Sequence, residues 1–205
     1  MGGDPPTVMQ LDRDRLNEAR PTWFGGILYR SQTEARWAVF LVHMDIPFEY
    51  EERHFDLAGI FYLPDFWLPK QNCWLEIKGP YPTRVEKEKA RRLAAHEQRN
   101  VYLCFGDIPE LEDPAWYTGS CIVFFPDGRD DESHWWCECP ICGTLGLQFH
   151  GSTASLPCGC LRNIPLEGHR SPRLLRAYAD AKAAESCRRT NDEDLLIAGP
   201  ATFRY

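Results

Sequence analysis

The sequence predicts an α/β protein with one core of alternating strands and helices, followed by a small module built around cysteines. Three observations favour this organisation. Helices expected at residues 31–42 and 84–99 alternate with strands expected at 62–68, 74–78 and 101–105. Five of the nine cysteines cluster between Cys137 and Cys160. At 205 residues with 43% hydrophobic content, the chain can bury one ordinary core and still carry a small appended module.

We therefore divide the chain into five consecutive parts. They are an N-terminal lead-in (1–22), the α/β core (23–130), a cysteine-rich ribbon (131–165), a C-terminal helix (166–190) and a tail (191–205). Within the core, residues 119–125 are an expected strand, and the turn formers at 126–128 end it. Ser171 and Pro172 open the C-terminal helix, because proline is tolerated in the first turn of a helix.

A first core helix is expected to begin at Ser31. Ser31 and Glu34 have the spacing of a capping box, in which the serine caps the helix start and the glutamate reaches back to the backbone. The apolar residues that would pack this helix on a sheet recur at helical spacing: Ala35, Ala38, Val39 and Val42. Glu34 would lie near one end of the site described next, either as a metal ligand or as a purely capping residue.

The most informative stretch is a predicted hairpin over residues 62–78. Turn formers at 69–72 separate two apolar runs, so the strands can fold back and bring Asp65 beside Glu76. Glu76 and Lys78 point to the same side of the second strand, because side chains alternate with period two. Two neighbouring carboxylates repel unless a cation or proton lies between them, and their hard oxygen atoms favour Mg²⁺ or Mn²⁺.

This set of side chains suits phosphodiester hydrolysis. A divalent ion on Asp65 and Glu76 can activate a water, while the Lys78 ammonium orients that water or stabilises charge on the phosphate. The alternative is an ordinary solvent-facing ion pair beside a turn. The order of acid, hairpin, acid-x-lysine, glycine and basic helix favours the hydrolytic site.

The basic helix is predicted over residues 84–99, where six lysines and arginines face three glutamates. A locally positive helix beside carboxylates can hold a DNA backbone through phosphate contacts. The predicted DNA contacts are Arg84, Lys87, Lys89 and Arg91. The alternative is a solvated, salt-bridged helix face, because Glu86 and Glu88 lie within one turn of these cations.

Pro64-Asp65 followed by Glu76-Ile77-Lys78 resembles the PD-(D/E)XK nuclease superfamily. The similarity covers residues 27–107, and the surrounding sequence is similar to the small phage-encoded members. The resemblance implies a restriction-endonuclease-like core, in which helices flank a mixed central sheet. It implies a metal-dependent DNA endonuclease that hydrolyses phosphodiester bonds.

The resemblance also implies a role for each site residue. Glu34, Asp65, Glu76 and the backbone carbonyl of Ile77 would hold Mg²⁺ or Mn²⁺, and Lys78 would complete the catalytic set. The layout is similar to that of the family of phage junction-resolving endonuclease I, which cuts branched DNA as a dimer. DNA is therefore the expected partner, a homodimer is an implied possibility, and a structure-selective, Holliday-junction-type resolvase is an alternative to a general endonuclease.

The clustered cysteines predict a structural zinc site of the ribbon type. A Cys-Pro-x-Cys-Gly turn lets two thiolates grip one zinc, and a second pair closes the tetrahedron. The expected ligands are Cys139, Cys142, Cys158 and Cys160, with Cys137 and His150 as substitutes. The remaining cysteines are expected to be ordinary small apolar residues: Cys73, Cys104, Cys121 and Cys187.

Charge and hydropathy limit the remaining classes. The formal net charge of −7 disfavours a non-specific DNA coat, so any DNA contact must be focal. No apolar run approaches the length of a membrane span and nothing resembles a signal peptide, so we expect a reducing compartment, the cytoplasm, and no membrane partner. A non-catalytic adaptor, in which the zinc ribbon binds nucleic acid, is the alternative from another class.

Overall fold

A computed structural model of the chain describes residues 20–108, 121–184 and 188–189. The α-helices in these ranges are α2 (Gln32–His43), α3 (Arg84–Glu97) and α4 (Pro172–Ala183). None of them is long and apolar enough to cross a membrane. The predicted tail, most of the predicted lead-in and Cys187 lie outside the described residues.

A seven-stranded sheet forms the centre of the molecule, with strand order β11-β10-β9-β8-β7-β6-β3. The pair β7 and β8 is parallel, with α3 as the connection between the two strands, and the other neighbouring pairs are antiparallel. The strands are β3 (Glu49–Tyr50), β6 (Phe66–Leu68), β7 (Cys73–Lys78), β8 (Asn100–Phe105), β9 (Cys121–Phe124), β10 (Asp130–Glu138) and β11 (Leu145–Phe149). The predicted α/β class is therefore confirmed, with a mixed central sheet.

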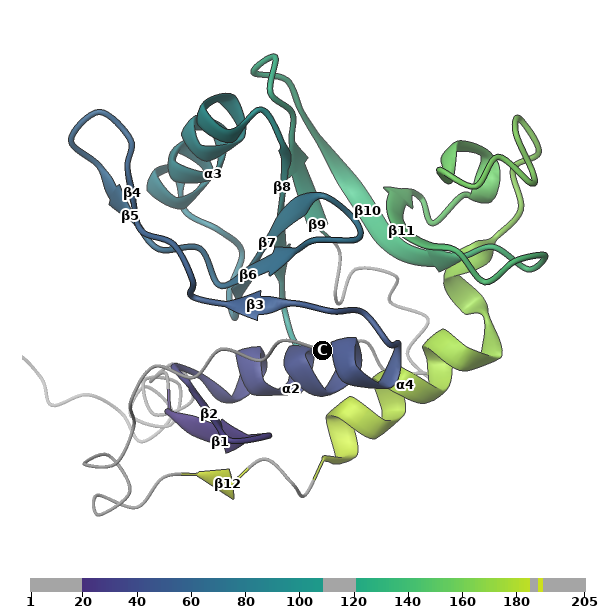
Figure 1. Cartoon of the computed structure of the whole chain (residues 1–205), viewed down its shortest axis with the longest axis horizontal. Helices are drawn as coiled ribbons and strands as arrows, with labels where there is room; N and C mark the ends of the chain where they lie inside the picture. Colours follow the sequence, from purple (N-terminus) through teal and green to yellow (C-terminus); the bar gives the residue numbers. More distant parts are fainter. Residues whose placement is uncertain (1–19, 109–120, 185–187, 190–205) are drawn as a thin grey trace, which may run out of the picture.

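Two smaller sheets lie beside the central one. The first has the order β12-β1-β2 and consists of β12 (Arg188–Arg189), β1 (Thr22–Phe24) and β2 (Ile27–Tyr29). The second is the hairpin of β4 (Phe55–Asp56) and β5 (Phe61–Tyr62), which projects beside α3 (Figure 1). Short 3₁₀ turns, η1 (Thr153–Ser155) and η2 (Gly168–Arg170), occur in the cysteine-rich region.

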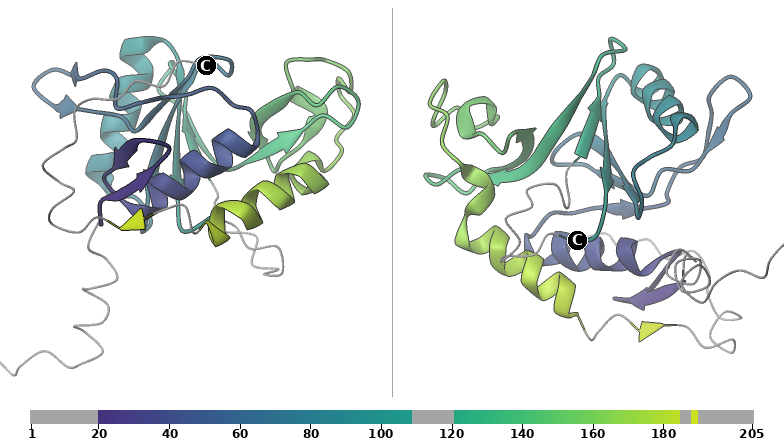
Figure 2. Two further views of the ribbon diagram at one scale, coloured as in Figure 1. Left: turned by 60° about the horizontal axis from the view of Figure 1, so that its bottom comes forward. Right: turned by 180° about the vertical axis from the view of Figure 1, so that it is seen from behind.

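Helices cover both faces of the central sheet, with α3 over one face and α2 and α4 over the other (Figures 1 and 2). The alternation of side chains along β7 explains this arrangement. Leu75 and Ile77 belong to the core that contains the buried residues of α2 and α4. Trp74 belongs instead to the core under α3 and the β4–β5 hairpin. Glu76 and Lys78 share the face of Trp74, so they look toward α3.

The central sheet continues into the cysteine-rich region through β10. This strand pairs with β9 on one side and with β11 on the other. A register shift between Asp131 and His134 marks an irregularity in the β9 pairing. Ser171 caps α4: its hydroxyl oxygen accepts from the backbone N–H of Leu174 at 3.2 Å, so the helix opens at Ser171 and Pro172 as the sequence predicts.

One expectation about the isolated cysteines was wrong. Cys104 on β8 and Cys121 on β9 stand directly opposite each other and are joined by a disulfide. Both are fully buried in the sheet, which is why each resembles a small apolar core residue in the sequence. Their pairing depends on the β8–β9 register, which local spacing does not reveal. Cys73 is a free, buried core cysteine, as expected.

Candidate functional site

The site begins with the hairpin of β6 and β7. Phe66 stands opposite Leu75 in the antiparallel register, so Asp65, one residue earlier, comes level with Glu76. The backbone N–H of Asp65 donates to Glu76 Oε2 at 3.1 Å. The predicted juxtaposition of the two acids is therefore confirmed. Asn72 in the connecting turn has a φ of 54°, a left-handed conformation that asparagine tolerates.

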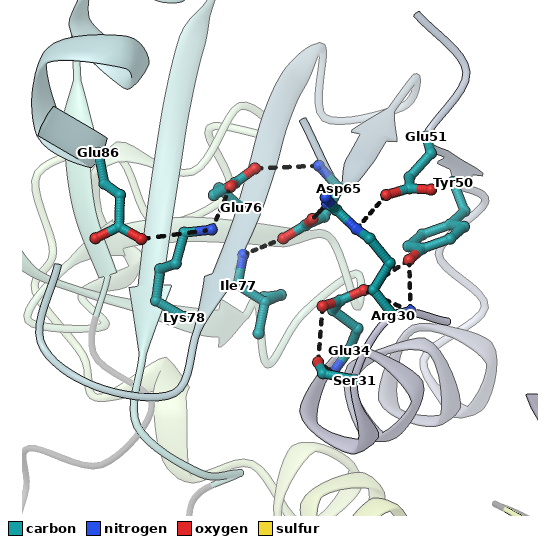
Figure 3. A network of polar contacts seen from close by, with 10 residues as sticks. All are labelled: Arg30, Ser31, Glu34, Tyr50, Glu51, Asp65, Glu76, Ile77, Lys78 and Glu86. Atoms are coloured by element: carbon teal, nitrogen blue, oxygen red, sulfur yellow. Dashed lines mark hydrogen bonds and ion pairs between the residues drawn. The ribbon is translucent and has the colours of Figure 1, made fainter. Parts of the chain in front are cut away.

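Asp65 is almost completely buried, at 1% exposure. Its Oδ2 accepts from the backbone N–H of Ile77 at 2.7 Å. Its Oδ1 lies 2.6 Å from a guanidinium nitrogen of Arg30 (Figure 3). The carboxylate is therefore fixed from the sheet on one side and covered by a cation on the other.

Burial raises the pKa of Asp65 well above its usual value, and the nearby carboxylates of Glu76 and Glu34 raise it further. The positive charge of Lys78 and the hydrogen bond from Ile77 act in the opposite direction. The effects of burial and like-charge repulsion are the larger ones, so the net shift of the Asp65 pKa is upward. A buried acid with such a pKa is a common feature of sites that bind cations or move protons.

Lys78 lies on the same face of β7 as Glu76. Its Nζ is 2.7 Å from Glu76 Oε1 and 3.8 Å from Glu86 Oε1, in the first turn of α3. Burial alone would lower the pKa of Lys78, but the attraction of Glu76 and Asp65 outweighs it and the pKa is raised. Lys78 is therefore a firmly protonated cation within the acidic site. Tyr62 is also buried there, and burial together with the charge of Glu76 raises its pKa well above the usual value.

Glu34 both caps α2 and faces the site. Its backbone N–H donates to the Ser31 hydroxyl oxygen at 3.2 Å, and Ser31 Oγ donates to Glu34 Oε1 at 2.7 Å. The other oxygen, Oε2, accepts from the Tyr50 hydroxyl at 2.6 Å and from the backbone N–H of Arg30 at 3.2 Å. Burial and the charge of Glu34 raise the pKa of Tyr50, which stays a neutral donor.

The sequence analysis assigned no role to Arg30, Tyr50, Glu51 or Tyr62, although all four lie in this site. Arg30 is the central one, because its guanidinium contacts both Asp65 and Glu51. Glu51 follows β3, and burial raises its pKa. Their positions in the sequence could have indicated a role. Arg30 directly precedes the capping residue Ser31, and Tyr50 and Glu51 precede the hairpin that carries Asp65.

Every carboxylate oxygen of Asp65, Glu76 and Glu34 has a donor or cation beside it (Figure 3). Within the described ranges, the cysteine cluster is the one group with three or more potential ligand atoms within 4.8 Å of one another. The three carboxylates are thus near one another, but each is bound to its own hydrogen-bond donors and cations. A cation could be held here by exchange with Arg30, because hard carboxylate oxygens match divalent ions such as Mg²⁺.

The cysteine cluster is a second site, at the far end of β10. The sulfur atoms of Cys139, Cys142, Cys158 and Cys160 all lie within 4.8 Å of one another, so the four predicted ligands come together and could hold a structural metal such as zinc. Each pair lies on a turn with a left-handed glycine, Gly143 (φ 72°) after the first pair and Gly159 (φ 67°) within the second.

The two substitute ligands are not part of this group of four. Cys137 is buried, and its thiol donates to the carbonyl of Ser152 at 3.5 Å. Burial raises the pKa of Cys137 to about 12, so it remains a thiol. Hydrogen bonds from Thr144 lower the pKa of Cys142 to about 6, which favours the thiolate that binds zinc. His150 instead stacks on Phe149.

The predicted basic helix corresponds to α3, whose N-cap residue Thr83 forms a capping box with Glu86. A hollow of about 450 Å³ beside its first turns is lined by Tyr81, Pro82, Arg84, Lys87, Glu88 and Arg91. Lys87 donates to the Tyr81 hydroxyl at 2.7 Å, and Arg91 pairs with Glu88 and Asp130. The ion pairs of the predicted salt-bridged face are therefore present on α3.

No family model, curated protein or solved structure matches the chain. The functional argument therefore rests on the geometry of the two sites.

Proposed function

We propose that this protein is a metal-dependent DNA endonuclease of the PD-(D/E)XK type. The single observation that carries the proposal is the register of the β6–β7 hairpin. It brings Asp65 level with Glu76 and leaves Lys78, two residues on, in an ion pair with Glu76 at 2.7 Å. Acid, acid and lysine on one buried hairpin is the minimal set for this hydrolysis.

The donor set suits Mg²⁺ or Mn²⁺. Asp65 and Glu76 supply carboxylate oxygens, Ile77 supplies its backbone carbonyl, and Glu34 lies at the start of α2 beside them. A bound ion would supply Lewis-acid activation of water and neutralise charge on the phosphate. Lys78, held by Glu76 and Glu86, would orient the attacking water and stabilise charge on the phosphoryl oxygens.

The architecture supports the same proposal. In a restriction-endonuclease-like core, helices flank a mixed sheet, and α2, α3 and the parallel β7–β8 pair supply those elements here. We assign the four cysteines to a structural zinc ribbon. Four thiolates leave no open ligand position, so this metal would stabilise its lobe and not take part in the reaction.

DNA would approach along α3, whose first turn contacts Lys78 through Glu86. The predicted phosphate contacts Arg84, Lys87, Lys89 and Arg91 lie on this helix. Of these, Arg91 is already held by two carboxylates, so we expect the other three to make the main contacts. Because such contacts carry affinity without sequence information, they fit a focal cationic surface on an acidic protein.

The test is a cleavage series on linear duplex, single strand, supercoiled plasmid and four-way junction, with Mg²⁺, Mn²⁺ or neither. We expect divalent-dependent cutting, reduced about 100- to 1,000-fold in Lys78→Ala. Lys70→Ala is the matched control, because Lys70 is an exposed lysine in the turn of the same hairpin. Circular dichroism and zinc content establish that each variant is folded.

The outcomes separate the proposed function from its alternatives. Preference for the four-way junction, together with dimerisation, would identify a structure-selective resolvase. Binding of DNA by the folded, zinc-loaded wild type without any cutting would overturn the proposal in favour of a non-catalytic binding module. Cutting that survives in Lys78→Ala would overturn the assignment of the site.

A further inference from the structure

Arg30 covers the buried carboxylate of Asp65 at the protein surface. Its side chain is 51% exposed, whereas the Asp65 side chain beneath it is 1% exposed. The backbone N–H of Arg30 is held by Glu34 Oε2 at 3.2 Å and by the Tyr50 hydroxyl at 3.0 Å. The main chain of Arg30 is therefore anchored, and its half-exposed side chain contacts Asp65 and Glu51 (Figure 3).

Arg30 covers the one oxygen of Asp65 that the sheet does not use. Oδ2 accepts from the Ile77 N–H at 2.7 Å, and Oδ1 lies 2.6 Å from the Arg30 guanidinium. A guanidinium and a divalent ion repel each other strongly at contact distance, and more so at a buried group. An ion held by Asp65 must therefore replace Arg30 on Oδ1.

After release from Asp65, the Arg30 guanidinium would stay beside the carboxylate site at the protein surface. Its Nε pairs with Glu51, whose side chain is 22% exposed and therefore closer to the solvent than that of Asp65. Lys78 differs, because it pairs with Glu86 as well as Glu76 and keeps that carboxylate if an ion takes the Glu76 oxygen. Arg30 is thus the cation that metal binding sets free.

From these contacts we infer that Arg30 is a substrate-binding residue: it rests on Asp65 in the metal-free protein and passes to a phosphate of the DNA backbone when a divalent ion takes its place. This inference rests on the proposed nuclease function. A planar guanidinium donates two parallel hydrogen bonds to a phosphate, which a released arginine beside the carboxylate site is suited to make. The exchange makes phosphate binding at this position depend on the metal.

The first measurement is Mn²⁺ affinity, by calorimetry on the zinc-loaded protein at pH 8. We expect Arg30→Gln to bind Mn²⁺ about tenfold more tightly than the wild type, because a charge-assisted contact no longer competes for Asp65. Arg36→Gln removes the same charge from α2 without contacting Asp65, since Arg36 pairs with Asp107. We expect it to change the Mn²⁺ affinity less than about twofold. Asp65→Asn should abolish the binding.

The second measurement is DNA affinity in the cleavage-deficient Lys78→Ala background, by fluorescence anisotropy with a labelled duplex. We expect the added Arg30→Gln substitution to weaken binding about tenfold in Mg²⁺, and less than about twofold without it. A merely structural role of Arg30 would lower both affinities by the same factor.

The outcomes distinguish this inference from the function on which it rests. If wild-type Mn²⁺ binding does not depend on Asp65, the proposed metal site fails, and the role of Arg30 with it. If binding depends on Asp65 but Arg30→Gln leaves it unchanged, the inference alone is overturned. Equal losses of DNA affinity with and without Mg²⁺ would also overturn it.

Discussion

The cysteine cluster and the carboxylate site contain similar numbers of potential metal ligands but are built in opposite ways. The four sulfur atoms lie within 4.8 Å of one another on two short turns. The carboxylates of Glu34, Asp65 and Glu76 come from a helix start and two strands, and their oxygens are occupied by donors and cations.

Under the proposed function, this difference would separate a structural metal from a catalytic one. A zinc ion held by the four thiolates would be coupled to folding of the cysteine lobe. At the carboxylate site, Arg30 and Lys78 already balance much of the charge of the acids. A divalent ion would therefore bind there by exchange with a side-chain cation, which would suit a site that loads and releases ions and substrate.

The largest expected effect is the loss of a thiolate ligand. Cys158→Ser should abolish zinc binding and cost several kcal/mol of stability in the cysteine lobe, because metal binding there is coupled to folding. The lobe's own buried hydrophobic core is small, because it consists of Cys137, Cys139 and Leu156. Elemental analysis gives the zinc content, and chemical denaturation gives the free energy of unfolding.

Cys137→Ala is the matched control for this prediction. Cys137 is a buried neighbour outside the group of four, so its loss should leave one zinc per chain and cost only about 1 kcal/mol of packing. If Cys137→Ala lost the zinc, or Cys158→Ser kept it, the ligand assignment would be wrong.

Much of the fold could be predicted from the sequence because its signals are local. The capped starts of α2 and α4 and the basic helix α3 depend on residues within one or two helical turns. The hairpin that brings Asp65 beside Glu76 depends on the turn formers between its two strands. The same holds for the four cysteines, whose two turns carry their own glycines. Period and spacing are sufficient evidence for such features.

Contacts between distant segments could not be predicted in this way. Arg30 reaches Asp65 across 35 positions of sequence, so this contact exists only when the segment before α2 lies beside the β6–β7 hairpin. Cys104 and Cys121 are 17 residues apart and become partners only through the β8–β9 register. Neither pairing has a local period or turn signature, so both appear only when the chain is folded.

The second prediction concerns the pH dependence of the carboxylate site without a divalent ion. Because the pKa of Asp65 is raised on folding, the folded state holds a proton that the unfolded chain releases above its ordinary pKa. The free energy of unfolding should therefore fall as pH rises from the ordinary pKa of Asp65 toward the raised one. Asp65→Asn should remove this fall and be on the order of 1 kcal/mol more stable than the wild type at neutral pH.

Denaturation curves of zinc-loaded protein between pH 4.5 and 8 measure this effect, run without added divalent ion. Asp45→Asn serves as the control, because its carboxylate is exposed just after α2 and pairs with Arg173. Adding Mg²⁺ at pH 8 should stabilise the wild type but not Asp65→Asn, by mass action on the folded state. A wild type whose stability rises with pH across this window would contradict the prediction.

The smallest expected effect concerns α3, where some cationic side chains are held by carboxylates and others are not. Arg91 pairs with Glu88 at 3.0 Å and Asp130 at 2.7 Å. Arg84 is exposed and has no hydrogen bond or ion pair with any described residue. Arg84→Ala should weaken DNA binding about threefold to tenfold and lower the salt dependence by about one phosphate contact.

Arg91→Ala should change DNA affinity less than about twofold, because a phosphate would have to displace two carboxylates that already hold this guanidinium. Anisotropy titrations at several salt concentrations, in the Lys78→Ala background, measure both variants against the same duplex. Equal losses would mean that α3 contributes only its total charge. Unequal losses would mean that the cations free of intramolecular partners bind the DNA, while the salt-bridged ones hold the helix in place.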